Sequence, residues 1–415
     1  QFMELVDAIH SRHAKLILDI AINHTGWGAR LHETHPHWVK RTEDGRIEVP
    51  GAWGIWWEDL TKLDYSHPDL WQFMAGVFLT WCRRGVDGFR CDAGYMVPTD
   101  AWHYIIARVR EEYPDTIFFL EGLGGKISVT RDLLNRANFD WAYSELFQNY
   151  DRRQIEHYFP EPNEIAACDG VMINFVETHD NPRLAATSKT YARMRTALCA
   201  LLSKNGGFAF ANGVEWFATE KIDVHEATPL NWGAEDNQVA HIRRLNTLLK
   251  VHPAFFDGAE LAFVQEGGGN FVAVSRHHVS SGKQLLIVAN LDHENGMDAS
   301  WRPVIAPNDY RYLFDLISGN RFCVDRRRNG YGLHLKAGQV LCLSADEHDV
   351  ETVVRAEKEI VEVPERIGRQ RLQAKTLDVY QHFYGNRHLG EFDPAAEAER
   401  LKADPEGFCR RLNGK

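Results

Sequence analysis

Membrane-length apolar runs, paired cysteines and an excess of positive charge are all missing from this sequence of 415 residues. No stretch approaches the ~18 consecutive apolar residues that a membrane-spanning helix needs. The seven cysteines are scattered, odd in number and never arranged as CxxC pairs, so they predict neither a disulfide framework nor a zinc site. There are 47 Lys and Arg against 58 Asp and Glu, which gives a formal net charge of −11. This balance argues against nucleic acid or an anionic membrane as a partner.

The composition is nevertheless that of a protein with a large core. The chain is 44% hydrophobic and 25% charged, which excludes intrinsic disorder over most of its length. Its length predicts two or three domains, unless one of them is a large barrel. Because no signal-peptide pattern stands at the N-terminus, we expect a cytoplasmic protein.

The pattern of apolar residues divides the chain into three parts. Residues 1–252 alternate short apolar runs with amphipathic helical stretches, which predicts βαβ units and a parallel sheet. Residues 253–345 hold short strands separated by Gly, Asn and Asp, which predicts an antiparallel β-sandwich. Residues 346–415 are charged and helical, and we expect a C-terminal extension there.

Three acidic residues follow strands of the predicted parallel sheet: Asp92, Glu121 and Asp180. Arg90 lies two residues before Asp92, so both side chains point to one face of the strand, and the arginine favours an ionised carboxylate. Glu121 follows the apolar run Ile-Phe-Phe-Leu, where partial burial would raise its pKa and suit a proton donor. Two carboxyl groups with opposite tuning are what glycoside hydrolysis requires.

Four separated motifs carry a resemblance to the α-amylase family of glycoside hydrolases, in order and in spacing, over about residues 1–345. The motifs are Asp19-Ile-Ala-Ile-Asn23-His24, Gly88-Phe-Arg90-Cys-Asp92-Ala93, Glu121 within Phe-Phe-Leu-Glu-Gly-Leu, and Phe175-Val-Glu-Thr-His179-Asp180. The resemblance implies a (β/α)8 TIM-type barrel over residues 1–252, a short domain B at about residues 25–67, and an antiparallel β-sandwich domain C over residues 253–345.

The resemblance also implies the roles of the residues in these motifs. Asp92 would attack the anomeric carbon, Glu121 would act as the acid and then the base, and Asp180 would stabilise the transition state. His24 and His179 would hydrogen-bond the same sugar, and Arg90 would orient Asp92. Asp19 and Asn23 would support the site, with Asp19 holding the arginine.

The sequence departs from the family pattern after Ala93. Many relatives continue this motif with Ala, Lys and His, whereas Gly94, Tyr95 and Met96 stand here. We therefore expect Tyr95 and Met96 to reshape the acceptor side. Sugar rings pack on aromatic rings, and loop tryptophans such as Trp56 are candidates for that contact.

No metal or other cofactor is expected to be obligatory. The segment between His24 and Pro68 lacks the Asp-rich loops that usually complete a calcium site, although Asn23 remains a candidate calcium ligand. His32, His35 and His37 have a spacing that matches no known zinc pattern, so a solvated loop is favoured for them.

The sequence thus predicts a retaining glycoside hydrolase that acts on α-1,4-linked glucans or malto-oligosaccharides through a covalent glycosyl-enzyme. Transglycosylation by the same residues is the alternative. It is kept open because residues 243–256 resemble maltosyltransferases that use maltose 1-phosphate, although no lysine closely follows Asp92 to hold a phosphate. A non-catalytic glucan-binding relative is the second alternative. Only six barrel strands are recognisable, so we expect the first two strands of the barrel to be missing from this chain.

Overall fold

The computed structural model describes residues 1–52, 54–205, 207–223, 226, 228–306, 311–358, 365–385, 387 and 389–414. The chain divides into two compact units. The first comprises Gln1–Glu145 with Glu161–Ile173, and the second comprises Leu146–Pro160 with Asn174–Lys415. No helix within the described ranges is long and apolar enough to cross a membrane.

Six parallel strands form one sheet in the order β1-β6-β7-β8-β9-β10. Their bounds are β1 (Ile17–Ala21), β6 (Gly88–Asp92), β7 (Ile117–Leu120), β8 (Trp141–Ser144), β9 (Val171–Phe175) and β10 (Phe208–Ala209). All six coincide with strands that the sequence predicts. A curled sheet of parallel strands in chain order fits a TIM-type barrel. That two further strands belong before β1 stays a prediction.

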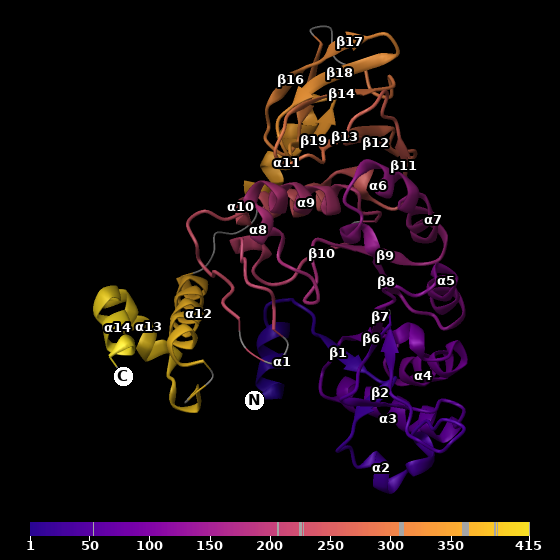
Figure 1. Ribbon diagram of the computed structural model, residues 1–415. Helices are drawn as coiled ribbons and strands as arrows, with labels where there is room; N and C mark the ends of the chain where they lie inside the picture. The colour runs from indigo at the N-terminus through magenta and orange to yellow at the C-terminus, as the bar shows by residue number, and fades with distance from the viewer. Residues whose placement is uncertain are drawn as a thin grey trace. The chain divides into compact units, whose positions relative to one another are not determined.

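Helices of the first unit cover this sheet. They are α3 (Pro68–Arg83), α4 (Thr99–Glu112) and α5 (Ile127–Arg136), and α4 and α5 flank the strands in Figure 1, while α1 (Phe2–His10) packs on α3 through Phe2 and Trp81. Apolar residues recur at helical spacing on α3 and α4, and their buried faces meet the sheet. Phe78 of α3 lies edge-on to Phe89 of β6, with ring centroids 4.7 Å apart. The sheet is close-packed at Gly88, where a Cβ atom would lie 2.7 Å from the Ile117 carbonyl oxygen.

The segment between β1 and α3, where domain B is expected, holds short elements. These are β2 (His24–Gly26), α2 (Leu31–Thr34), the 3₁₀ helix η1 (Pro36–Trp38), β3 (Gly51–Ala52), β4 (Ile55–Trp56) and β5 (Leu60–Lys62). β2 pairs with β5 and β3 pairs with β4, both antiparallel. The segment therefore leaves the sheet and returns to the start of α3 through paired strands.

The second unit contains further helices around the last part of the parallel sheet. They are α6 (Arg152–Tyr158), α8 (Leu184–Thr187), α9 (Lys189–Leu201) and α10 (Val239–Val251), while α7 (Pro160–Cys168) lies almost wholly in the first unit. α6 begins with a capping box, because the Asp151 carboxylate accepts from the Gln154 backbone while the Gln154 side chain accepts from the Asp151 backbone.

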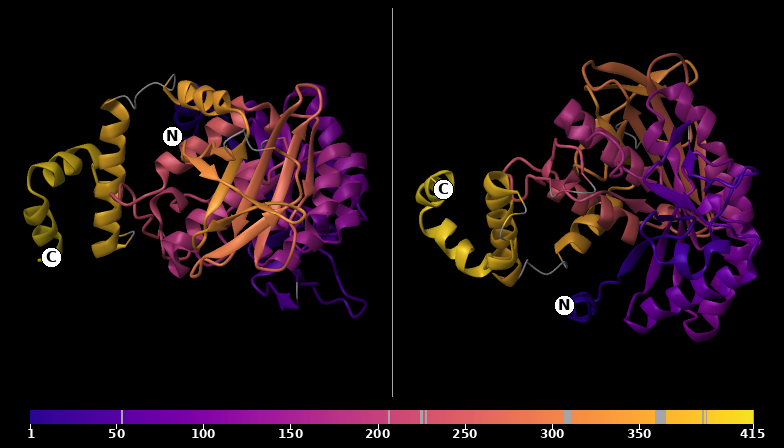
Figure 2. Two further views of the ribbon diagram at one scale, coloured as in Figure 1. Left: turned by 90° about the horizontal axis from the view of Figure 1, so that it is seen from above. Right: turned by 60° about the horizontal axis from the view of Figure 1, so that its bottom comes forward.

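The predicted C-terminal antiparallel domain is confirmed, with two sheets in the orders β11-β12-β13-β19-β15-β16 and β14-β18-β17. The bounds are β11 (Ala259–Phe263), β12 (Phe271–His278), β13 (Lys283–Asn290), β14 (Met297–Trp301), β15 (Tyr312–Asp315), β16 (Arg321–Cys323), β17 (Asp325–Arg327), β18 (Gly330–Leu335) and β19 (Val340–Ser344). Figure 2 shows the long strands side by side.

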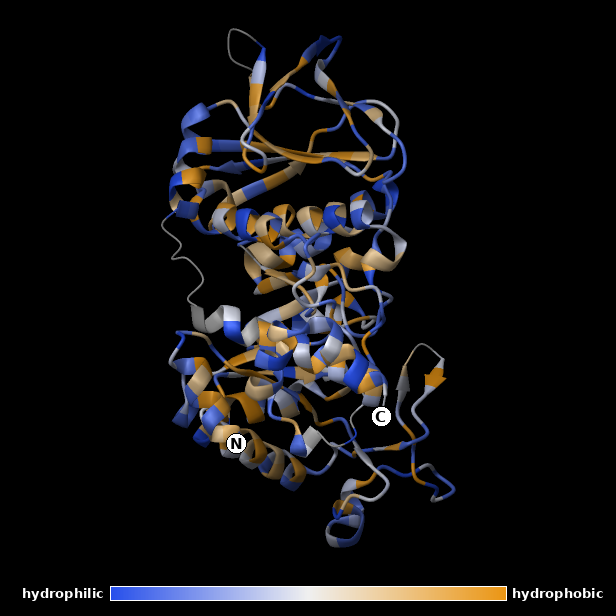
Figure 3. Ribbon diagram, turned by 90° about the vertical axis from the view of Figure 1, so that its left-hand side faces the viewer, coloured by the Kyte–Doolittle hydropathy of each residue, from blue (hydrophilic) through white to orange (hydrophobic). Residues whose placement is uncertain are grey.

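The central strands of the larger sheet hold continuous apolar runs, residues 271–274 of β12 and 285–289 of β13 (Figure 3), because both faces of the strands are buried there. Val272 and Val274 pack in the core that includes α9 and α10, whereas Phe271 and Ala273 pack toward the smaller sheet. Burial on both faces replaces the usual alternation with a continuous apolar run.

The residues after 345 are helical wherever they are described, apart from short connections. They form α11 (Glu347–Lys358), α12 (Glu365–Tyr384), α13 (Pro394–Ala403) and α14 (Pro405–Asn413). α11 is tied to the antiparallel domain by Lys283, whose ammonium lies 2.6 Å from the Asp349 carboxylate. α12, α13 and α14 pack on one another (Figure 2), and Tyr384 donates a hydrogen bond to the Leu412 carbonyl.

Candidate active site

Arg90 is the hub of a charged cluster at the carboxyl end of β1 and β6. The register pairs Asp19 with Arg90 across these strands. The Arg90 Nη1 donates to both carboxylate oxygens of Asp19 at 3.1 Å and forms an ion pair with Asp92, while Nε donates to the Tyr143 hydroxyl at 3.2 Å. Burial alone would lower the pKa of Arg90, but Tyr143, Asp19 and Asp92 together raise it above its ordinary value. The arginine is therefore a fixed cation.

Asp92 and Glu121 end neighbouring strands at the same level. Cys91 pairs with Leu120 in the register, and the Glu121 backbone donates to the Cys91 carbonyl at 3.1 Å. Neighbouring strands lie about 4.8 Å apart. The Asp92 side chain keeps 33% of its surface exposed, whereas Glu121 is only 8% exposed. One acid thus faces solvent beside a cation, and the other is nearly enclosed.

Both oxygens of the Glu121 carboxyl group have backbone partners. Oε2 accepts from the Ala93 N–H at 2.8 Å and Oε1 accepts from the Leu123 N–H at 2.9 Å. Burial raises the pKa of Glu121 to about 7, against the opposing influence of Arg90 and these two N–H groups. A carboxyl group with this pKa is partly protonated near neutral pH and can both give and take a proton, as the apolar strand before it predicts.

Ala93 takes a left-handed backbone conformation, with φ of 43°. This conformation is uncommon for a residue with a Cβ atom and is found preferentially at functional sites. It belongs to the turn that aims the Ala93 N–H at Glu121.

Asn23 and His24 follow β1 beside the same cluster. The Asn23 amide donates to the Met96 sulfur at 3.1 Å, and the Trp57 ring meets His24 edge-on with centroids 5.8 Å apart. Burial lowers the pKa of His24, although Asp92 opposes this. Within the described residues, the buried Asn23 Oδ1 and His24 Nδ1 have no hydrogen-bond partner. Such groups are suited to a ligand's hydroxyl groups.

The surroundings of Asn23 do not fit a calcium site. Ca²⁺ takes six to eight oxygen ligands, several of them carboxylates. The Asn23 amide N–H donates to the Met96 sulfur, and the one cluster of His, Cys, Asp or Glu ligands among the residues that the structure describes is that of His37, His67 and Asp69, which does not include a neighbour of Asn23 in the chain. We therefore derive no step through calcium.

Tyr95 and Met96, which stand where many relatives have Lys and His, lie next to the two acids. Tyr95 and Met96 belong to the 3₁₀ helix η2 (Gly94–Met96), directly after Ala93. Burial, then the charges of Glu121 and Asp92, raise the pKa of Tyr95 to about 12. Tyr95 is thus within electrostatic reach of both acids.

Trp57 packs on a predicted site residue, because its ring meets that of His24. Trp56 lies on the β3–β4 hairpin with 66% of its surface exposed, beside the equally exposed Ile55. The hairpin therefore presents an apolar tip to solvent. The sequence singled out Trp56 for a sugar contact and favoured a packing role for Trp57.

His179 and Asp180 follow β9 and belong to the second unit. The Asp180 side chain is 68% exposed, and His179 Nε2 lies 3.5 Å from its carboxylate. The turn that carries them is braced by a buried ion pair, in which Arg183 Nε lies 2.9 Å from the Glu177 carboxylate. Arg183 also donates to the Asn212 carbonyl at 2.6 Å, so the turn is anchored to the chain that follows β10.

Gly213 is required for this brace. A Cβ atom there would lie 2.3 Å from Nη2 of Arg183, and its φ of 94° is a conformation that favours glycine. Sequence reasoning missed the Glu177–Arg183 pair and Tyr143. An acid and an arginine six residues apart around His179 and Asp180 were the available signal for the pair.

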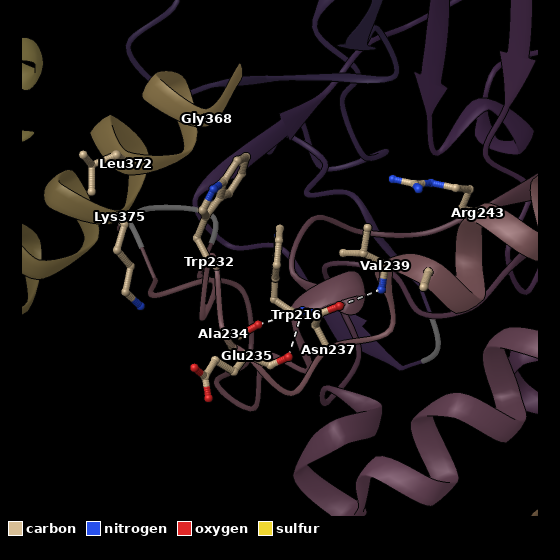
Figure 4. A pocket seen from close by; sticks show the side chains of 12 residues that line it. Trp216, Trp232, Ala234, Glu235, Asn237, Val239, Arg243, Gly368, Leu372 and Lys375 are labelled. Atoms are coloured by element: carbon tan, nitrogen blue, oxygen red, sulfur yellow. Dashed lines mark hydrogen bonds between the residues drawn. The ribbon is translucent and has the colours of Figure 1, made fainter. Parts of the chain in front are cut away.

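A cavity of about 610 Å³ lies within the second unit, between the chain after β10 and α12 (Figure 4). Trp216 and Trp232 stack there with ring centroids 6.0 Å apart, and Leu372 and Lys375 of α12 line the opposite side. Asn237 fixes the loop by donating to the carbonyls of Ala234 and Glu235. The C-terminal helix α12 is therefore packed against a loop of the barrel part.

No family model matches the chain. Among curated proteins it is similar to the alpha-1,4-glucan:maltose-1-phosphate maltosyltransferases of Methylacidiphilum infernorum, with 26% identity over 63% of this chain and 41% of that protein, and of Pseudomonas aeruginosa, with 28% identity over 61% and 40%. The corresponding protein of Cereibacter sphaeroides is 26% identical over 77% of this chain and 50% of its own length. The chain thus spans half or less of the length of these relatives.

Solved structures show the same fold. An alpha-amylase from Lactobacillus plantarum matches with a TM-score of 0.61 and 23% identity over 82% of this chain and 81% of that one. A maltogenic alpha-amylase from Thermotoga neapolitana matches with a TM-score of 0.66 and 20% identity over 82% and 80%. The resemblance to the α-amylase family that the four motifs indicate is thereby confirmed, and the proteins that this chain resembles are enzymes.

Proposed function

We propose that this relative of the α-amylase family is a retaining enzyme acting on α-1,4-linked glucans or malto-oligosaccharides, with Asp92 as nucleophile and Glu121 as acid and base. The observation that carries the proposal is the pairing of an arginine-held, partly exposed Asp92 with an enclosed Glu121 whose pKa is about 7. The two environments separate the two acids by role, as glycoside hydrolysis demands.

The strand register supports retention rather than inversion. Retaining enzymes hold their two carboxyl groups about 5–5.5 Å apart, and inverting enzymes leave about 6.5–9.5 Å for a water molecule. Asp92 and Glu121 stand at one level on strands that are about 4.8 Å apart. The register therefore places the two residues on neighbouring strands, as the short carboxyl separation of a retaining pair requires.

In the first step, the Asp92 carboxylate attacks the anomeric carbon while Glu121 protonates the departing glycosidic oxygen. The ion pair with Arg90 orients the Asp92 carboxylate for this attack. In the second step, Glu121 has lost its proton and takes one from the acceptor hydroxyl, which displaces Asp92 and restores the enzyme. The family resemblance adds His24, His179 and Asp180 as groups that hold the sugar hydroxyls.

Hydrolysis and transfer differ only in the acceptor that reaches the intermediate. The sequence first indicates hydrolysis, but the relatives above are maltosyltransferases by name, which favours transfer of a maltosyl unit to a glucan as the second candidate. Tyr95 and Met96 replace the Lys and His of many relatives, and we expect this replacement to change how the acceptor binds.

Incubation of the 415-residue chain with maltoheptaose, alone and with maltose 1-phosphate, separates the candidates by product chromatography. Shorter products alone indicate hydrolysis. Longer products from maltoheptaose alone indicate glucan transfer, and elongation only with maltose 1-phosphate, with release of phosphate, indicates maltosyl transfer. Glucan binding without any product contradicts the proposal and favours a non-catalytic glucan-binding protein.

A further inference from the structure

A second group of chemistry-bearing side chains lies at η1 and the start of α3. His37, His67 and Asp69 each place a potential ligand atom within 4.8 Å of the other two. His37 Nε2 lies 3.0 Å from the Asp69 carboxylate, and the rings of His37 and His67 meet edge-on at 5.2 Å. We propose that these three residues form a binding site for Zn²⁺, unrelated to the glucan chemistry.

The distances are close to those that a bound ion requires. Two ligands held about 2.0–2.2 Å from a tetrahedral zinc ion lie roughly 3.3 Å apart. The separation of His37 Nε2 from Asp69 Oδ2 is already near this value. The three ligand atoms lie within 4.8 Å of one another, and His37 and Asp69 keep about half of their surface exposed, so their side chains have room to turn toward one ion.

Backbone hydrogen bonds hold the segments around the site in place without an ion. Trp38 is buried, and its carbonyl accepts from the Asp64 N–H at 2.7 Å. Val39 and Leu63 form an antiparallel bridge next to this bond. The two segments that supply the ligands are therefore held side by side, although His37 and His67 are far apart in the sequence.

A second layer of contacts orients the carboxylate. The indole N–H of Trp38 donates to Asp69 Oδ2 at 2.9 Å. Hydrogen bonds of this kind fix the orientation of metal ligands, and their loss typically lowers metal affinity 10- to 100-fold. The Asp69 carboxylate is therefore held between the His37 ring and the Trp38 indole before any ion binds.

The ligand set selects the metal. Two imidazoles and one carboxylate suit Zn²⁺ and its neighbours among the transition metals, whereas Ca²⁺ and Mg²⁺ prefer oxygen ligands alone. Three protein ligands leave the fourth tetrahedral position to water. The ion would cross-link the segment that follows β2 to the first turn of α3 and so stabilise the first unit.

The test uses the full chain, purified without affinity histidines and stripped of metal, and titrated with ZnCl₂ by calorimetry and thermal unfolding. We expect binding of one equivalent of zinc and a rise in the unfolding temperature. His37→Gln should weaken zinc binding more than about tenfold, and Trp38→Phe about tenfold. Excess Mg²⁺ or Ca²⁺ should not compete.

His334→Gln is the matched control. His334 pairs with Asp298 at the same distance of 3.0 Å and is more exposed than His37, but no third ligand joins this pair among the residues that the structure describes. Zinc binding in this variant should equal that of the unaltered chain. No saturable zinc binding by the unaltered chain overturns the proposal, as does an equal loss in the His334 and His37 variants. His37 is exposed, so its replacement should leave the fold intact. Circular dichroism spectra of the two variants and of the unaltered chain show whether any loss of zinc binding comes from misfolding.

Discussion

Two arginines on strands of this protein are almost fully enclosed, and they serve opposite purposes. Arg90, at the end of the parallel sheet, is surrounded by the charged or polar groups of Asp19, Asp92 and Tyr143. Arg276, on β12 of the antiparallel domain, has no exposed surface and donates to the carbonyls of Ala254, Leu201 and Ser203.

The partners explain the difference between the two. Carboxylates raise the pKa of Arg90, whereas burial lowers the pKa of Arg276 to about 9, because neutral carbonyls compensate less of its desolvation. Arg90, which is surrounded by acidic groups, orients the residues of the candidate site. Arg276, which is surrounded by carbonyl groups, holds separate chain segments together. The comparison predicts that changes around Arg90 mainly affect turnover and that changes at Arg276 mainly affect stability.

Asp92→Asn should have the largest effect. It removes the nucleophile while leaving Arg90 its contacts with Asp19, so kcat should fall by on the order of 10⁴-fold or more, as for essential groups in other covalent mechanisms. Glucan affinity measured by calorimetry should persist. An active Asp92→Asn variant would break the comparison, because the acid beside Arg90 would then be structural.

Arg276→Met should lower the free energy of unfolding by roughly 3–5 kcal/mol, because three buried carbonyls lose their donor. Urea unfolding followed by circular dichroism measures this change. Turnover per folded molecule should be unaltered.

The control for this variant is Arg302→Met. Arg302 also donates to a carbonyl, that of Phe263 at 2.7 Å, but it is largely exposed. Its replacement should change the unfolding free energy by less than about 1 kcal/mol. Equal losses in the two variants would contradict the assignment of Arg276 as a buried fastener.

The pH dependence should report Glu121. Its pKa in the folded chain, about 7, lies above the ordinary value of 4.5, so the acid form is lost as pH rises. We expect kcat/KM to fall about tenfold per pH unit above that pKa. The contribution of Glu121 to stability is fully present below about pH 4.5 and is lost as pH rises through 7, because the folded state binds the proton more tightly in this window.

Glu121→Gln should flatten both profiles. It should also retain partial activity on substrates with good leaving groups, such as aryl glycosides, which need less protonation. An unchanged alkaline limb in this variant would place the proton donor elsewhere.

Tyr143→Phe should have the smallest effect. It removes one hydrogen bond at Arg90 Nε, a net contribution of about 1 kcal/mol, and leaves both carboxylate contacts in place. We expect a decrease of several-fold in kcat with little change in KM. A loss as large as that of Asp92→Asn would mean that Tyr143 itself takes part in the reaction.

The sequence predicted the parallel strands and the cluster at their ends because both depend on local pattern. Apolar runs within the motifs Asp19–His24 and Gly88–Ala93 mark the strands. Because side chains alternate between the two faces of a strand, Arg90 and Asp92 lie on the same face. α6 was missed although Asp151 and Gln154 form a capping box, a signal that the local sequence contains.

Contacts between distant segments were beyond such reasoning. Tyr143 reaches Arg90 only because β8 lies two strands away in the sheet. The sequence favoured a solvated loop for His37, since its partners His67 and Asp69 arrive through the pairing of residues 38–40 with residues 62–64. The groups that bind Arg276 are backbone carbonyls, which every residue has, so the sequence does not indicate which of them Arg276 contacts.

The most direct test of the account is to locate the covalent intermediate. The chain is incubated with a fluorinated α-glucosyl fluoride, which forms the glycosyl-enzyme but turns over slowly, and its peptides are mapped by mass spectrometry. The account predicts a single glycosyl adduct on Asp92, absent from the Asp92→Asn variant. An adduct on Asp180, Glu121 or Asp19, or active enzyme that forms product without any adduct, would contradict it.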